Sequence, residues 1–184
     1  MFSVVALLIY TVVRFITDIL KMNRKVYIDP QTGLFNKSRW DELMEDSAPV
    51  SHRTGVMMLD LNRLKYTNDT MGHKMGDKMI RCFADVLRQT LPTDWMICRW
   101  GGDEFTVLTS GADRNKMERY VSEISAAVDA YNASGEKPEI HFAAGYALSA
   151  DFPTLSRKEL LEKADEKMYQ NKNAWYQEHA LEHH

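Results

Sequence analysis

The chain has 184 residues, of which 27% are charged and 45% hydrophobic, so a disordered or fibrous protein is excluded and one domain with a short extension is expected. The formal net charge of −3 provides no global basic field, and we expect no nucleic-acid partner. Two cysteines, Cys82 and Cys98, are too few for a disulfide framework and match no zinc-binding spacing. They indicate two core thiols in a reducing compartment.

Residues 1–28 predict an apolar N-terminal helix. The uncharged run over residues 2–13 would span only about 18 Å as a helix, which is shorter than the ~30 Å core of a bilayer. Two interpretations stay open: the segment is the end of a transmembrane helix, or it is an amphipathic signalling helix that pairs with a second copy. The basic residues that follow favour a cytoplasmic domain of an inner-membrane protein; they are Arg14, Lys21, Arg24 and Lys25.

Residues 29–176 predict one domain, and residues 181–184 resemble the remnant of a purification tag. Residues 38–41 resemble a capping box that opens a short helix, with Trp40 facing inward. An apolar run over residues 55–60 predicts a buried strand, and helical spacing predicts a helix over 77–91. Further strands are expected over 95–100 and 105–108, joined by a glycine-containing turn over 101–104.

The second half of the domain continues the alternation. Helical spacing predicts a helix over 117–131, and residues 140–148 alternate as a strand with one buried face. Residues 156–159 form a capping box that starts the last helix. The order is β-α-β-β-α-β followed by a helix, which predicts an α+β fold of the ferredoxin-like or palm type, an antiparallel sheet with helices on one face.

Three acidic residues fall where strands end in this scheme. Asp60 ends the first strand, while Asp103 and Glu104 lie in the turn of the hairpin. Neighbouring strands would bring these carboxylates to one end of the sheet, where they suit a hard cation such as Mg²⁺ with positions left for phosphate oxygens. The alternative is that Asp60 caps the next turn and the other two are ordinary turn residues.

Residues 99–105 read Arg-Trp-Gly-Gly-Asp-Glu-Phe and resemble the signature of the GGDEF family, the diguanylate cyclases. Residues 29–36 are similar to the family's D-x-L-T-G-L-x-N motif, with Gln31 in place of the leucine. Residues 60–77 resemble D-I-D-x-F-K-x-x-N-D-x-x-G-H-x-x-G-D, and residues 164–172 resemble A-D-x-x-M-Y-x-x-K. Because four motifs occur in the right order over residues 29–173, the resemblance is specific.

The resemblance implies a role for each matching residue. Asp60, the backbone carbonyl of Leu61 and Asp103 would hold Mg²⁺ or Mn²⁺, and Glu104 would assist them. The substrate GTP would be bound by a second set. In it Lys65 and Lys172 contact the triphosphate, Asn68 and Asp77 bond the guanine, and Gly101 and Gly102 allow a close approach of the backbone.

The implied reaction joins two GTP molecules into cyclic di-GMP with release of pyrophosphate. Because each domain would hold one GTP, activity implies a homodimer, and the domain would be the output part of a bacterial signalling protein attached to the membrane through its N-terminal part. The alternative is a catalytically silent module in a membrane sensor that binds GTP or only dimerises. Retention of the metal acids and the signature glycines favours the enzyme.

The sequence departs from the family pattern in three further places. Pro92 and Trp95 stand where many members have an R-x-x-D product-inhibition site, so that site is expected to be absent. Asn173 stands where a glycine usually follows the last lysine, and Asn62 replaces the second acid of D-I-D. Outside these motifs, Trp40, Trp95 and Tyr169 are expected in the core, His73 in a structural role and Arg99 as a brace for the carboxylates.

Overall fold

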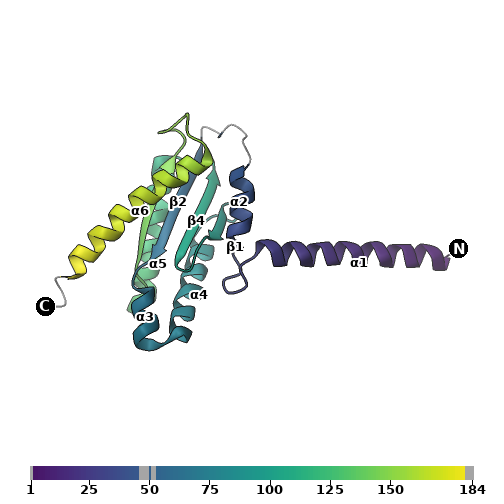
Figure 1. The fold of residues 1–184 in the computed structure, drawn as a ribbon, viewed down its shortest axis with the longest axis horizontal. Helices are drawn as coiled ribbons and strands as arrows, with labels where there is room; N and C mark the ends of the chain where they lie inside the picture. Colours follow the sequence, from purple (N-terminus) through teal and green to yellow (C-terminus); the bar gives the residue numbers. More distant parts are fainter. Residues whose placement is uncertain (1, 46–49, 51–52, 181–184) are drawn as a thin grey trace.

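A five-stranded sheet of order β1-β3-β4-β2-β5 forms the centre of the protein (Figure 1). The structure is a computed structural model that describes residues 2–45, 50 and 53–180, so the tag expected over 181–184 lies outside the described residues. The strands are β1 (Phe35–Asn36), β2 (Thr54–Leu61), β3 (Met96–Arg99), β4 (Glu104–Ser110) and β5 (Phe142–Leu148). The helices are α1 (Phe2–Tyr27), α2 (Lys37–Glu45), α3 (Leu64–Met71), α4 (His73–Thr90), α5 (Arg114–Ala133) and α6 (Arg157–Ala180).

The predicted fold class is confirmed, with one change in the sheet. Strand β2 pairs antiparallel with both β4 and β5, and β3 pairs antiparallel with β4, as the order of elements predicts. The two-residue strand β1, which was not predicted, joins the edge parallel to β3. The sheet is therefore mixed and not purely antiparallel.

Helices cover both faces of the sheet, so the expectation of helices on one face is wrong. Helices α4 and α5 pack on one face through Phe83 and Ile124, and α2 and α6 pack on the other through Trp40 and Leu160 (Figure 1). All eight residues of β2 are buried between these layers. Strand β2 therefore holds the carboxylate of Asp60, near its C-terminal end, at a desolvated position.

Strand β5 shows why the second face was missed. Its large residues face α4 and α5, and its small residues, Ala143, Gly145 and Ala147, face α6. A Cβ on Gly145 would lie 2.2 Å from the backbone nitrogen of Met168, so only glycine permits this close packing of α6. An alternation read from large side chains alone cannot detect such a face.

Several helix boundaries differ from the predicted ones. Helix α2 is capped by Asn36, whose Oδ1 accepts a hydrogen bond from the backbone nitrogen of Arg39 at 3.2 Å, so the capping box over residues 38–41 is wrong. Helix α4 begins at His73, and α3 was not predicted. The capping box of α6 is confirmed, because the backbone nitrogen of Ser156 donates to the Glu159 carboxylate at 2.8 Å and the backbone nitrogen of Glu159 donates to the Ser156 hydroxyl at 3.3 Å.

Two of the three aromatic residues expected in the core are buried, and the third is exposed. Trp40 and Trp95 are buried, with exposed fractions of 1% and 4%, and their core roles are confirmed. Tyr169 is 61% exposed, so its assignment to the core is wrong. Its position on α6 turns the ring away from the sheet that Ala164 and Met168 cover.

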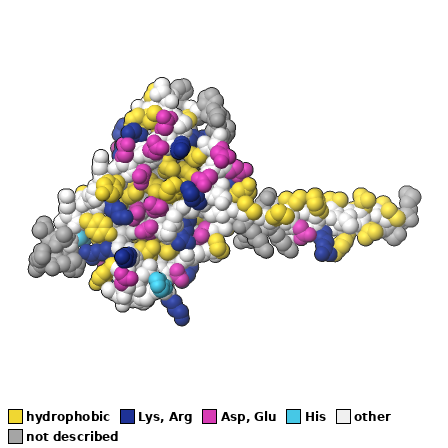
Figure 2. Space-filling view, in the orientation of Figure 1, with side chains coloured by type: hydrophobic (Ala, Val, Ile, Leu, Met, Phe, Trp, Pro, Cys, Tyr) yellow, Lys and Arg dark blue, Asp and Glu magenta, His cyan; other side chains and the backbone are white. Residues whose placement is uncertain are grey.

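Helix α1 projects from the sheet and helix layers, and its apolar side chains are exposed along most of its length (Figures 1 and 2). Its C-terminal end is joined to the domain by a 2.8 Å hydrogen bond from Asn36 Nδ2 to the carbonyl of Val26. The guanidinium of Arg39 lies 5.4 Å from the centre of the Tyr27 ring. In the part of the chain that the structure describes, no helix has the length and apolar character needed to cross a membrane.

Candidate active site

Asp60 and Glu104 lie opposite each other where β2 ends and β4 begins. The backbone nitrogen of Leu61 donates a hydrogen bond to the carbonyl of Asp103 at 3.0 Å, which ties the turn before β4 to the end of β2. The structure thus brings the three acids of the sequence analysis to one end of the sheet. The side chain of Asp60 is 7% exposed, whereas Asp103 and Glu104 are half-buried.

The acids influence one another electrostatically. Burial raises the pKa of Asp60, the charges of Asp103 and Asp165 add to that increase, and Lys172 opposes it. Burial also raises the pKa of Glu104, and the charges of Asp103 and Asp60 act in the same direction. Deprotonated carboxylates at this end of the sheet repel each other, so the site favours a bound cation.

Lys172 of α6 supplies one positive charge to this end of the sheet. Its Nζ atom lies 2.7 Å from Oδ1 of Asp60. Burial lowers the pKa of Lys172, but the hydrogen bond and charge of Asp60 raise it overall. The lysine that the resemblance assigns to the triphosphate therefore contacts, in this structure, the acid that the resemblance assigns to the metal.

The donors present are of the type that Mg²⁺ and Mn²⁺ prefer, because carboxylate oxygens are hard ligands. Within the described ranges, no three Asp, Glu, His or Cys side chains are arranged to hold a metal ion together. Oxygens of water or of a ligand would complete the coordination of a cation bound by the carboxylates at the sheet end. The residues present fit a hard divalent cation.

Lys65 lies at the start of α3, beside a cavity of about 550 Å³. Arg63, Tyr66, Asp69 and Tyr176 line the same cavity. Arg63 adopts a left-handed backbone conformation with φ of 62°, and its backbone nitrogen donates to the hydroxyl of Tyr176 at 3.3 Å. Tyr176 follows Lys172 by one helical turn of α6, so the cavity adjoins the face of α6 that carries Lys172. The sequence analysis did not identify Arg63, because no pattern distinguishes it from a surface arginine.

Asn68 and Asp77 come from the two helices of the α3–α4 pair. A Cβ on Gly76 would lie 2.1 Å from Oδ1 of Asn68. Because glycine has no side chain, it leaves room for the Asn68 side chain in its observed position. Both residues assigned to guanine thus lie near the first turns of α4. Gly76 was given no role in the sequence analysis, because it lies before the helix predicted over residues 77–91, whereas α4 begins at His73.

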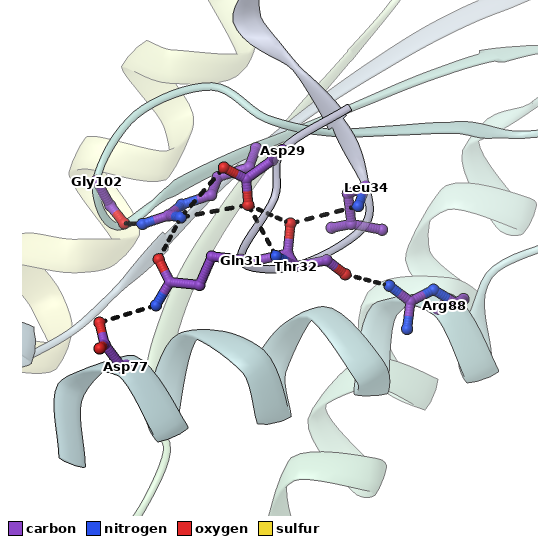
Figure 3. A network of polar contacts seen from close by, with 8 residues as sticks. Asp29, Gln31, Thr32, Leu34, Asp77, Arg88 and Gly102 are labelled. Atoms are coloured by element: carbon purple, nitrogen blue, oxygen red, sulfur yellow. Dashed lines mark hydrogen bonds and ion pairs between the residues drawn. The ribbon is translucent and has the colours of Figure 1, made fainter. Parts of the chain in front are cut away.

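A chain of polar contacts joins Asp77 to the turn that carries Asp103 (Figure 3). Gln31 Nε2 donates to Asp77 Oδ1 at 2.9 Å, and Arg99 Nη1 donates to Gln31 Oε1 at 2.6 Å. Arg99 also donates to the carbonyl of Gly102 at 2.8 Å and forms an ion pair with Asp29 at 3.3 Å. Arg99 therefore braces the turn through a backbone carbonyl and Asp29. Gln31 was noted in the sequence only as a departure from the motif.

Asp29 is the carboxylate that forms the ion pair with Arg99 in this network. Burial acts to raise its pKa, but two hydrogen bonds from Thr32 and the charge of Arg99 lower the pKa overall. The Thr32 hydroxyl donates to Asp29 at 2.7 Å and accepts from the backbone nitrogen of Leu34 at 3.3 Å (Figure 3). This loop before β1 is thus organised around Asp29.

The two signature glycines have different surroundings. A Cβ on Gly101 would lie 2.4 Å from the Glu104 carboxylate. A Cβ on Gly102 would meet no atom of the described residues within 4 Å, and Gly102 has no positive φ. The fold therefore does not require a glycine at Gly102.

Comparisons with known proteins agree with this geometry. The family described as "Diguanylate cyclase, GGDEF domain" matches residues 26–177. The diguanylate cyclase DgcP of Pseudomonas aeruginosa is 31% identical over 157 residues, which are 82% of this chain and 23% of the relative. The diguanylate cyclase DgcS of Shewanella oneidensis is 29% identical over 83% of this chain and 51% of its own length. The chain thus spans about a quarter of the length of DgcP and about half of the length of DgcS.

Solved structures show the same fold. The coiled coil and GGDEF domain of DgcB from Caulobacter crescentus, solved with c-di-GMP, has a TM-score of 0.79 at 23% identity and 94% coverage of both chains. The GGDEF domain of PA1120 from Pseudomonas aeruginosa has a TM-score of 0.67 at 27% identity, over 80% of this chain and 90% of that one. With four ordered motifs, the acids at one end of the sheet and the family match over most of its length, this chain belongs to the GGDEF domain family of diguanylate cyclases.

Proposed function

We propose that residues 29–176 form a cyclase domain that condenses two GTP molecules into cyclic di-GMP and two pyrophosphates. The observation that carries the proposal is the meeting of Asp60, Asp103 and Glu104 at one end of the sheet, next to Lys172. The relatives named as diguanylate cyclases support the same reaction. Residues 1–28 would be a separate signalling helix.

In each half of the reaction, the 3′-hydroxyl of one GTP loses its proton to solvent, and its oxygen forms a bond to the α-phosphorus of the other. The bond from that phosphorus to the bridging oxygen of the β-phosphate breaks, and pyrophosphate leaves. Asp60, the carbonyl of Leu61 and Asp103 would hold Mg²⁺ or Mn²⁺, which would activate the hydroxyl and neutralise developing charge. Glu104 adds negative charge that strengthens cation binding at this end of the sheet.

The triphosphate and the base would be held by different parts of the domain. Lys65, beside its cavity, and Lys172 would contact the triphosphate as point charges. Asp77 would accept hydrogen bonds from N1 and the exocyclic amine of guanine, next to Asn68. Adenine offers no such pair of donors, and an unpaired acceptor in the bound state is costly. The open space at Gly102 fits the close approach of a nucleotide to the turn.

A homodimer is part of the proposal, because the two GTP molecules must meet between two domains. The exposed apolar side chains of α1 support pairing with a second copy of this helix. The solved DgcB structure, which aligns with 94% of this chain, contains a coiled coil and a GGDEF domain. We also propose that the full protein is attached to the inner membrane through its N-terminal part, with this domain in the cytoplasm.

The test is incubation of the purified protein with GTP and Mg²⁺ at several protein concentrations, with products identified by mass. Cyclic di-GMP whose specific activity rises with protein concentration is the expected result. The matched control is Asp103→Ala, which removes a metal ligand at a half-buried turn and should abolish turnover while the protein stays folded. Binding of GTP without conversion at every concentration would contradict the proposal and favour a silent GTP-binding module.

A further inference from the structure

Gln31 links two parts of the proposed site that are far apart in the sequence. It lies in the loop before β1, and its side-chain amide bridges Asp77 on α4 and Arg99 at the end of β3 (Figure 3). Arg99 continues the link to the carbonyl of Gly102. One amide thus connects the carboxylate proposed to read guanine with the turn that carries Asp103.

The chemistry of the partners fixes the orientation of this amide. Arg99 can only donate hydrogen bonds, so the Gln31 oxygen must face it; ionised Asp77 can only accept, so the Gln31 nitrogen must face the carboxylate. A glutamine has one acceptor and one donor group at the end of its side chain, and both are used at 2.6 and 2.9 Å. A leucine, which the family motif has at this position, offers neither group.

The contact leaves Asp77 able to bind a base. Gln31 uses one lone pair of Oδ1, and a carboxylate can accept about four hydrogen bonds in total. Asp77 is exposed at the surface of α4, where a free carboxylate would sample several rotamers. The bond from Gln31 holds it in one of them, which reduces the ordering needed when a ligand binds.

We propose that Gln31 is a positioning residue for base recognition, which orients the Asp77 carboxylate and ties it through Arg99 to the turn at Gly102. The inference rests on the proposed function, since it assumes that Asp77 reads guanine. Gln31 therefore affects how well the site distinguishes guanine from a purine without the exocyclic amine.

The test measures equilibrium binding of 3′-deoxy-GTP and 3′-deoxy-ITP to the protein in the presence of Mg²⁺. Both analogues lack the attacking hydroxyl and cannot condense, and inosine lacks the amine that Asp77 would contact. In the unmodified protein we expect tighter binding of the guanosine analogue. Gln31→Leu should reduce that preference about tenfold, as expected when one oriented hydrogen bond to a charged group is lost. Binding of the inosine analogue should change much less.

Three further variants separate positioning from a structural effect. Gln31→Glu should reduce the preference at least as strongly, because its carboxylate would face Asp77. In an Asp77→Asn background, Gln31→Leu should have no further effect on the preference, since both changes act on the same contact. Gln89→Leu, an exposed glutamine on the same helix as Asp77, is the matched control and should change nothing.

The outcomes distinguish the two proposals. An unchanged preference in Gln31→Leu, or an equal loss of affinity for both analogues together with a lower melting temperature, would overturn the role of Gln31 and leave the cyclase proposal standing. Unmodified protein that binds neither analogue would overturn the cyclase proposal itself. If the unmodified protein and Asp77→Asn bind both analogues with the same preference, Asp77 does not contact the guanine amine. That result would refute both the assignment of Asp77 and the role of Gln31.

Discussion

Lys172 and Asp60 are 112 residues apart in the sequence, yet Nζ of the lysine lies 2.7 Å from Oδ1 of the aspartate. The contact joins α6 to the C-terminal end of β2, an interior strand of the sheet. Asp60 is almost fully buried, so an unpaired charge there would be costly, and the lysine offsets that cost. The same lysine is proposed to contact the triphosphate, so one side chain serves the stability of the free protein and the binding of substrate.

We expect Lys172→Met to lower both stability and activity. The free energy of unfolding should fall by about 1–3 kcal/mol, because a hydrogen bond to a buried charged group is lost. Turnover should fall as well, since the triphosphate loses a cation. Urea unfolding and steady-state rates with GTP measure the two effects. The control is Lys163→Met, which removes an exposed ion pair with Glu166 and should cost less than about 1 kcal/mol. Equal stability of the two variants would contradict this account of the pair.

The sequence predicted most of the sheet, because β2 to β5 carry runs or alternations of large apolar residues. It did not predict α3, whose residues 64–71 are mostly polar and resemble a loop. It also missed the close packing of α6, which depends on small residues such as Gly145 and not on large ones. Burial of large side chains leaves a periodic pattern in the sequence, and close approach of two backbones leaves a much weaker one.

The residues of the proposed site were named from motifs, but their contacts were not predictable. The bond between Gln31 and Asp77 joins positions 46 residues apart, and only the packing of α4 against the loop before β1 brings them together. In the same way, nothing in the local sequence indicates that Lys172 pairs with Asp60. Motif spacing identifies residue types, while the fold decides which of their polar groups face each other.

We expect Gly102→Ala to separate the needs of the reaction from those of the fold. A Cβ there meets no described atom within 4 Å, so the free energy of unfolding should change by less than about 0.5 kcal/mol. Turnover should fall at least about tenfold if the nucleotide approaches the backbone at this point. Parallel urea titrations and rate measurements provide the check.

The contrasting variant is Gly145→Ala, whose Cβ would lie 2.2 Å from the backbone of α6. Overpacking of this kind costs about 1–3 kcal/mol or more, so this variant should be clearly destabilised. A Gly102→Ala protein that is as destabilised as Gly145→Ala, or that keeps full activity, would show that the glycine serves the turn and not the substrate.

Product inhibition through an R-x-x-D site is not expected in this domain. Trp95, at the position of the aspartate, is 4% exposed, and its ring centre lies 4.8 Å from that of Tyr120. Pro92, at the position of the arginine, has no charged group to bind a phosphate. Initial rates measured with added cyclic di-GMP should show only competitive inhibition at the GTP site, which excess GTP relieves. Inhibition by low-micromolar product that persists at saturating GTP would contradict this prediction.

The pH dependence of stability should report the ionised state of Asp29. Its pKa is lower in the folded protein than the ordinary value of 3.8, through Thr32 and Arg99, so folding favours the ionised form. This contribution is fully present above pH 3.8 and is lost as the pH falls through the lower pKa of the folded state. We expect Asp29→Asn to be less stable than the unmodified protein by about 1 kcal/mol at neutral pH, because the ion pair with Arg99 is lost. The difference should shrink as the pH falls below 3.8 and through the lower pKa of the folded state, because the unmodified protein then also loses the charge. Urea titrations of both proteins over a series of pH values measure this difference in the free energy of unfolding. A difference that stays constant down to the lowest pH at which both proteins fold would contradict the prediction. Asp29 would then stabilise the loop through its shape and hydrogen bonds and not through its charge.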